Sequence, residues 1–191
     1  MGRFAARIYF DAFEHGLKLV GFMTLVVLLI TATPFDATRL AVVPRTVGGL
    51  TGVLIGPMVH ANVLHLAVVA LPLFALLSIS FWSRRHRTGP MLGMLWLATG
   101  ASAWLVGPTG GHHLGASALV TAFVGYLMTG AWITGRRQVF LGAVVCGGLA
   151  MVAWILLPQP TLLWAELLGY PIGGVAALLN RGRLKARAVP I

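Results

Sequence analysis

Six apolar stretches divide the chain, and short polar connectors separate most of them. A helix of about 20 apolar residues is long enough to cross the hydrocarbon core of a bilayer. Each stretch reaches or approaches that length, so the pattern predicts an all-α membrane protein with six transmembrane helices. The stretches are 19–33, 58–82, 90–106, 115–134, 139–157 and 161–179.

Three polar segments complete the chain, which we interpret as a single membrane domain over 1–191. They are a head (1–18), a long loop (34–57) and a basic tail (180–191). The loop is rich in Gly and Pro and too polar to cross a membrane, so we expect a partly structured outer loop with interfacial turns. A cleaved signal peptide is an alternative for the first stretch, but the long head with two acidic residues argues against cleavage.

The composition agrees with a membrane location. With 58% hydrophobic and 9% charged residues, the chain is too apolar for a water-soluble domain of this size. A net charge of +10 is compatible with nucleic-acid binding, but the basic residues lie in connectors rather than on one helix face. We therefore expect the lipid bilayer, and no nucleic acid, as a partner. The single cysteine, Cys146, excludes an intrachain disulfide, and we expect no metal or cofactor.

The basic residues also predict the orientation. Twelve of the 14 Lys and Arg residues lie in the head, in two connectors and in the tail, which six crossings place on one side. Only Arg39 and Arg45, in the long loop, fall on the other side. Because cytoplasmic loops carry the excess of positive charge, we expect both termini in the cytoplasm and a multi-pass protein of the plasma membrane.

Four polar side chains share one predicted depth near the outer surface. His60 and His65 begin the second stretch, Ser117 begins the fourth and Glu166 begins the sixth. Glu166 is the only acid in any of the six stretches, and ionisable groups in a membrane are commonly functional. Structural interpretations remain open: helix packing for Ser117, hydrogen-bonded core positions for the histidines, and a protonated carboxyl group for Glu166.

Two further histidines, His112 and His113, occupy a Gly-rich connector on the outer side. We expect both to be exposed to solvent, with metal binding as a less favoured alternative.

In their order along the chain, the motifs resemble those of rhomboid-family intramembrane serine proteases. They are His60-Ala-Asn-Val-Leu-His65, Gly115-Ala-Ser117 and Gly169-x-x-x-Gly173. The resemblance implies a six-helix rhomboid-like bundle with Ser117 as the nucleophile. It also implies that His65 stabilises the oxyanion, with His60 as its upstream companion. Gly115, Gly169 and Gly173 would then be helix-packing positions.

The chain departs from the family pattern at the positions that carry the chemistry. Val69 replaces an oxyanion-binding asparagine, Ala118 replaces a glycine, and Thr121 replaces an aromatic residue. Glu166 stands where the family has its histidine base, and no histidine follows His113. A carboxylate is a poor substitute, because histidine titrates near working pH.

These departures favour an inactive or impaired homologue that binds the transmembrane helices of client proteins. An active serine endopeptidase using Ser117 with a nonstandard base, such as His113, is one alternative. A small proton-coupled transporter using Glu166 and the histidines is another, although no inverted repeat is visible in the sequence.

Overall fold

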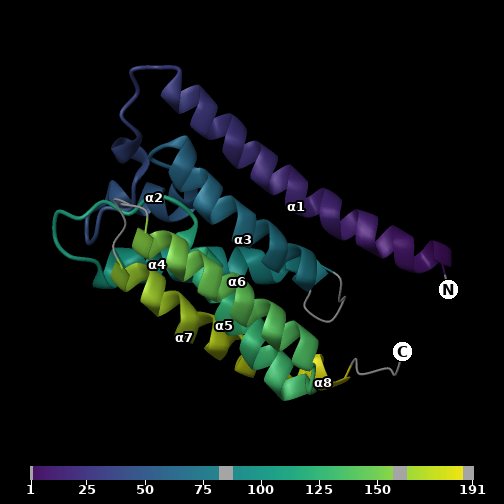
Figure 1. Cartoon of the computed structure of the whole chain (residues 1–191). Coiled ribbons are helices and arrows are strands. Elements are labelled where there is room, and N and C mark those ends of the chain that lie inside the picture. Colours follow the sequence, from purple (N-terminus) through teal and green to yellow (C-terminus); the bar gives the residue numbers. More distant parts are fainter. Residues whose placement is uncertain (1, 82–87, 157–162, 187–191) are drawn as a thin grey trace.

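In the computed structural model, every regular element among the described residues is a helix (Figure 1). The structure describes residues 2–81, 88–156 and 163–186. The only β-type pairing within these ranges is an isolated bridge between Val42 and His113. The helices are α1 (Gly2–Thr31), η1 (Ala37–Leu40), α2 (Gly49–Ile55), η2 (Gly56–Met58), α3 (Val63–Phe81), α4 (Thr88–Val106), α5 (Ser117–Thr134), α6 (Arg137–Leu156), α7 (Leu163–Leu179) and α8 (Arg181–Ala186).

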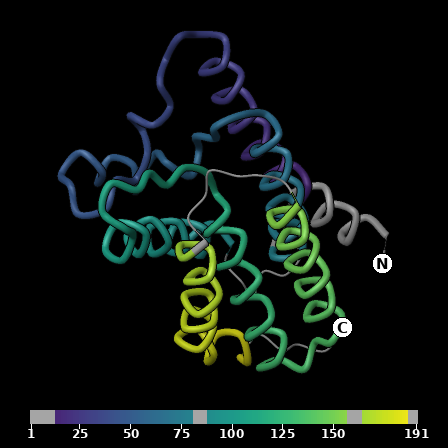
Figure 2. The backbone as a smooth tube through the Cα atoms, turned by 60° about the vertical axis from the view of Figure 1, so that its left-hand side comes forward, coloured from purple at the N-terminus to yellow at the C-terminus, as the bar shows by residue number. Residues whose placement is uncertain are grey.

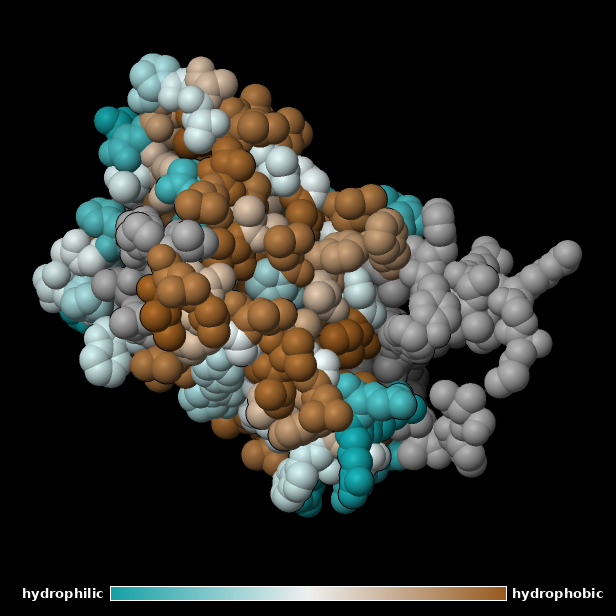
Figure 3. Space-filling model, in the orientation of Figure 1, coloured by the Kyte–Doolittle hydropathy of each residue, from teal (hydrophilic) through white to brown (hydrophobic). Residues whose placement is uncertain are grey.

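Five of these helices are long and apolar enough to cross a membrane. They are α1, α3, α4, α5 and α6, and α7 is a shorter apolar helix. The expected all-helical architecture of a membrane protein is confirmed at this level. The outer surface agrees with it, since apolar side chains cover much of the face in Figure 3.

The helix bounds differ most from the expected stretches in two places. The polar head is not a separate segment, because α1 already begins at Gly2 and its apolar part starts at Phe13. An i, i+4 ion pair between Glu14 and Lys18 stabilises this part of the helix. The second stretch begins as the 3₁₀ turn η2, and α3 starts only at Val63. Residues 82–87, which cover most of the predicted connector 83–89, residues 157–162, which cover the connector 158–160, and the end of the tail, 187–191, lie outside the described residues.

The long loop is more structured than a series of turns. It contains η1, α2 and η2, and α2 packs on α4. Arg45 anchors the loop to the end of α4 although its φ is +57°, which is uncommon for a non-glycine residue. Its guanidinium donates hydrogen bonds to the carbonyl oxygens of Leu105 (3.2 Å) and Gly107 (2.8 Å) and to Thr109 Oγ1 (2.7 Å).

Helix α5 is the centre of the molecule, and Figure 2 shows it between α7 and α6. Its contact with α7 is the most extensive between any two helices among the described residues. Glycines allow this approach: a Cβ on Gly169 would lie 2.5 Å from the carbonyl oxygen of Ala118, and one on Gly173 would lie 2.6 Å from the amide nitrogen of Tyr126. The first turns of α5 and α7 are therefore held side by side.

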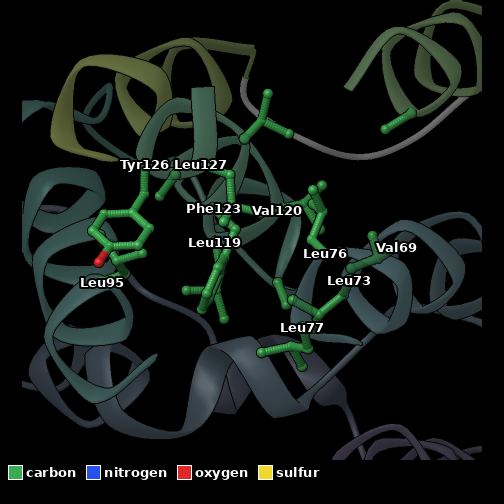
Figure 4. Packing of buried hydrophobic residues seen from close by; sticks show 14 of the residues in the cluster. Val69, Leu73, Leu76, Leu77, Leu95, Leu119, Val120, Phe123, Tyr126 and Leu127 are labelled. Atoms are coloured by element: carbon green, nitrogen blue, oxygen red, sulfur yellow. The ribbon is translucent and has the colours of Figure 1, made fainter. Parts of the chain in front are cut away.

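A hydrophobic core fills the space between α3, α4 and α5 (Figure 4). Leu119 and Phe123 of α5 are buried in the same cluster as Leu73 and Leu76 of α3. Val69, one turn before Leu73, belongs to this cluster and is fully buried. The core lies directly below the ends of α3 and α5 that carry the histidines and Ser117.

Candidate functional site

The first turn of α3 holds His65 in a fixed position. The backbone N–H of His65 donates to Asn62 Oδ1 at 2.7 Å, so Asn62 caps the helix. The His65 side chain is fully buried, as is that of His60 just before the helix. The two rings lie 5.1 Å apart in an edge-to-face arrangement. The short turn between these residues thus brings both imidazoles together.

Gly115 lies directly against these two rings. Its φ of +92° favours glycine, and an added Cβ would lie 2.9 Å from Cε1 of His65 and 3.1 Å from Cδ2 of His60. Gly115 precedes α5 instead of lying within it, so its packing partners are imidazole rings and not a helix backbone. The entry to α5 is therefore positioned by the histidine pair.

His60 also contacts the backbone next to the serine. Its Nε2 accepts a hydrogen bond of 3.4 Å from the N–H of Ala116, the residue before Ser117. This bond requires a neutral ring with its proton on Nδ1. Burial, together with the nearby His65, lowers the pKa of His60 to about 3, in agreement with a neutral ring.

His113 corrects an expectation from the sequence. It was expected to be exposed, but only 5% of it is accessible, whereas its neighbour His112 is exposed. The backbone explains the difference: His113 exchanges two hydrogen bonds with Val42 of the long loop, at 2.9 and 3.0 Å, which fix it beneath that loop. Burial and the nearby His65 lower the pKa of His113 to about 4.

Ser117 is the first residue of α5 and is fully buried. Its Oγ makes no hydrogen bond with any of the described residues. A serine acts as a nucleophile only when a base accepts its proton, and such a pair normally lies within hydrogen-bond distance. In this structure no base is engaged with Ser117.

Glu166 lies in the first turn of α7, and 1% of it is accessible. Its neighbour Ala165 belongs to the same buried cluster as Ala118, the residue after Ser117. One turn further along α7, Tyr170 is close enough to Glu166 for electrostatic interaction. The carboxyl group is thus carried on the turn of α7 that faces the first turn of α5.

Taken together, the residues form two neighbouring groups at the start of α5. One group is His60, His65 and Gly115, in direct contact, with His113 near His65. The other is the facing turns that carry Ser117 and Glu166. No cluster of three or more metal-binding side chains occurs in the part of the chain that the structure describes. The arrangement offers neutral imidazoles and a buried hydroxyl group.

Sequence reasoning missed two contributors to this site. The Ala116 amide could not be found, because its role depends on where the His60 ring lies. The burial of His113 depends on pairing with Val42, a residue 71 positions earlier in the chain. No local pattern in the sequence indicates either contact.

Comparison with known proteins gives relatives but no assigned activity. No protein-family model matches the chain, and no solved structure does. An uncharacterized protein of Mycobacterium tuberculosis and one of Mycobacterium bovis are each 28% identical over 189 residues, covering 91% of this chain and 79% of the relative. An uncharacterized protein of Mycobacterium leprae is 26% identical over 190 residues, covering 91% and 75%. This chain is therefore similar to mycobacterial proteins over most of its length.

Proposed function

We propose that this chain is a rhomboid-like membrane protein with six transmembrane helices and little or no peptidase activity, which binds the transmembrane helices of other membrane proteins. Helix α7 is the sixth crossing in this proposal. The order of the motifs along the chain supports the family assignment. The contact of Gly169 and Gly173 with α5 supports the helix arrangement that it requires.

The observation that carries the proposal is Glu166 on the turn of α7 that faces the start of α5. A serine nucleophile needs a partner that accepts its proton and later returns it to the leaving amine. Histidine can do both near neutral pH, whereas a buried carboxyl group tends to retain its own proton. Loss of the base typically lowers the rate by several orders of magnitude.

The oxyanion side of the site supports the same conclusion. Val69, at the position of the family's asparagine, has no hydrogen-bond donor and is buried in the apolar cluster of α3 and α5 (Figure 4). The Ala116 amide donates to His60 and is not free to bind an oxyanion. Loss of one oxyanion donor costs roughly 10² to 10³ in rate. Impaired catalysis therefore has two independent causes.

The surface of α6 supports binding of client helices. Gly148 has no neighbouring atom within 4 Å of the position where a Cβ would lie, so it leaves a notch on this helix. Val144 and Val152, one turn to either side, are 41% and 53% exposed. Small residues on an exposed face of a transmembrane helix let a second helix approach closely. We place the client helix on this face.

Photocrosslinking in lipid vesicles tests the proposal. A crosslinking amino acid at Val152 should capture a single-span test peptide more efficiently than one at Leu28, a lipid-facing position of α1 with 52% exposure. Gly148→Leu, which fills the notch, should reduce capture from Val152, while Ser117→Ala should not affect it. Equal capture from both positions would contradict client binding on α6.

A further inference from the structure

A second candidate site lies far from the histidines, at the turn between α5 and α6. A cavity of about 430 Å³ opens there. It is lined by Ala131, Trp132, Gly135, Arg137, Phe140 and Leu141. None of these residues belongs to the region around Ser117 and Glu166. That region lies at the N-terminal ends of α5 and α7, whereas the cavity lies at the C-terminal end of α5. The cavity therefore needs its own explanation.

The lining of the cavity is apolar and accessible from the surface of the molecule. Trp132 is 75% exposed, Leu141 is 61% exposed and Phe140 is 37% exposed. These residues lie where two apolar helices end, which is the level of the boundary between hydrocarbon and headgroups. A hollow with exposed apolar walls at this depth is suited to an acyl chain and not to a water-soluble ligand.

The same cavity has a positive edge. Arg137 is part of the lining and Arg136 precedes it, and neither is paired with a carboxylate among the described residues. Helix α8, which packs on α5, lies at this end of the molecule (Figure 1) and carries Arg181, Arg183 and Lys185. Figure 3 shows a hydrophilic patch directly beside apolar surface in this region. The local charge is complementary to an anion.

We propose that this cavity binds an anionic glycerophospholipid. One acyl chain lies along Trp132, Phe140 and Leu141, and the phosphate is bound by Arg137. The planar guanidinium group can donate two parallel hydrogen bonds to a phosphate, and clustered basic residues attract anionic lipids to the membrane surface. This inference does not depend on whether Ser117 has any catalytic role.

Native mass spectrometry of the full chain in a non-ionic detergent tests the proposal. The protein is supplied with equal amounts of phosphatidylglycerol and phosphatidylcholine that have identical acyl chains. We expect preferential retention of phosphatidylglycerol. Arg137→Gln should reduce that retention roughly tenfold, because a charge-assisted contact is lost. The matched control Arg39→Gln, an exposed arginine of the long loop that does not line the cavity, should change it by less than about twofold.

Two more variants separate the parts of the site. Leu141→Trp, which fills the apolar hollow, should reduce retention of both lipids. Arg137→Lys keeps the positive charge but loses the planar guanidinium group, so its retention of phosphatidylglycerol should be intermediate. It replaces Arg137→Gln if that variant fails to fold. Equal retention of the two lipids, or equal losses for Arg137→Gln and Arg39→Gln, would overturn the proposal. So would a dimer that Leu141→Trp abolishes, since a second copy would then occupy the cavity.

Discussion

At the scale of single residues, the serine and the two glycines of α7 were visible in the sequence, whereas their environment was not. A serine between alanines at the start of an apolar stretch marks either a nucleophile or a packing position. The contacts that distinguish these roles come from distant segments: Gly115 lies on the rings of α3 and its preceding turn, and Gly169 lies on α5. The spacing of residues in the sequence identifies candidate site residues, whereas only the three-dimensional contacts show what surrounds each of them.

The glycine contacts give a prediction for stability. Gly173→Ala should lower the free energy of unfolding by about 1 to 3 kcal/mol, because the new methyl group would press on the backbone of α5. The control Gly148→Ala should be neutral or stabilising by up to about 1 kcal/mol, because that site is open and alanine favours helix. Unfolding of both variants in a denaturing detergent gives the comparison. Equal stabilities would show that α5 and α7 are not in close contact.

The buried histidines predict a dependence of stability on pH. The folded-state pKa of His113, about 4, lies below the usual value of 6.5, so the unfolded chain binds more protons between these values. Stability should therefore fall as the pH drops from about 6.5 towards 4, by up to about 1.4 kcal/mol per pH unit for each such histidine. His60 acts in the same direction.

Thermal unfolding between pH 7.5 and 5 measures this effect. His113→Gln should weaken the pH dependence, whereas His112→Gln should leave it unchanged, because His112 is exposed. An unaltered profile in the His113 variant would contradict its burial as a neutral group.

At the scale of elements, hydrophobic patterning predicted the long helices, but it did not predict the short helices within the long loop. Apolar length alone indicates where α3 to α6 lie, because in a membrane the backbone must form its hydrogen bonds within a helix. The fold of the loop over 34–57 depends on long-range bonds such as those from Arg45 to the end of α4. The periodicity of hydrophobic residues along the chain does not reveal such long-range contacts.

Arg45 provides the test at this scale. Arg45→Ala removes the side-chain hydrogen bonds to Leu105, Gly107 and Thr109 and should destabilise the loop by about 1 kcal/mol. Faster amide hydrogen exchange over 37–58 would report the loss. Arg39→Ala, an exposed arginine of the same loop, is the control and should exchange like the unmodified chain. Similar exchange in both variants would exclude an anchoring role for Arg45.

At the scale of the whole molecule, the start of α1 and the short helix α8 lie at the same end of the bundle (Figure 1). The six crossings proposed above would produce this arrangement. The distribution of Lys and Arg residues predicts that this end faces the cytoplasm.

Reporter fusions test the orientation. Alkaline phosphatase fused after Gly110 should be active, because that residue lies in a predicted outer connector. The same enzyme fused after Gly135 or at the C-terminus should be inactive. Activity at the C-terminus would contradict a six-crossing topology with cytoplasmic termini.

We propose that the chain retains a rhomboid-like site in which Glu166 replaces the histidine base. The deciding measurement is cleavage of single-span test substrates by the purified protein in lipid, with unmodified protein, Ser117→Ala, Glu166→His and the double variant compared side by side. We expect the unmodified protein and Ser117→Ala to be inactive, and Glu166→His to gain activity that the double variant loses. Cleavage by the unmodified protein that Ser117→Ala abolishes would refute this proposal and would establish a working protease with a different base.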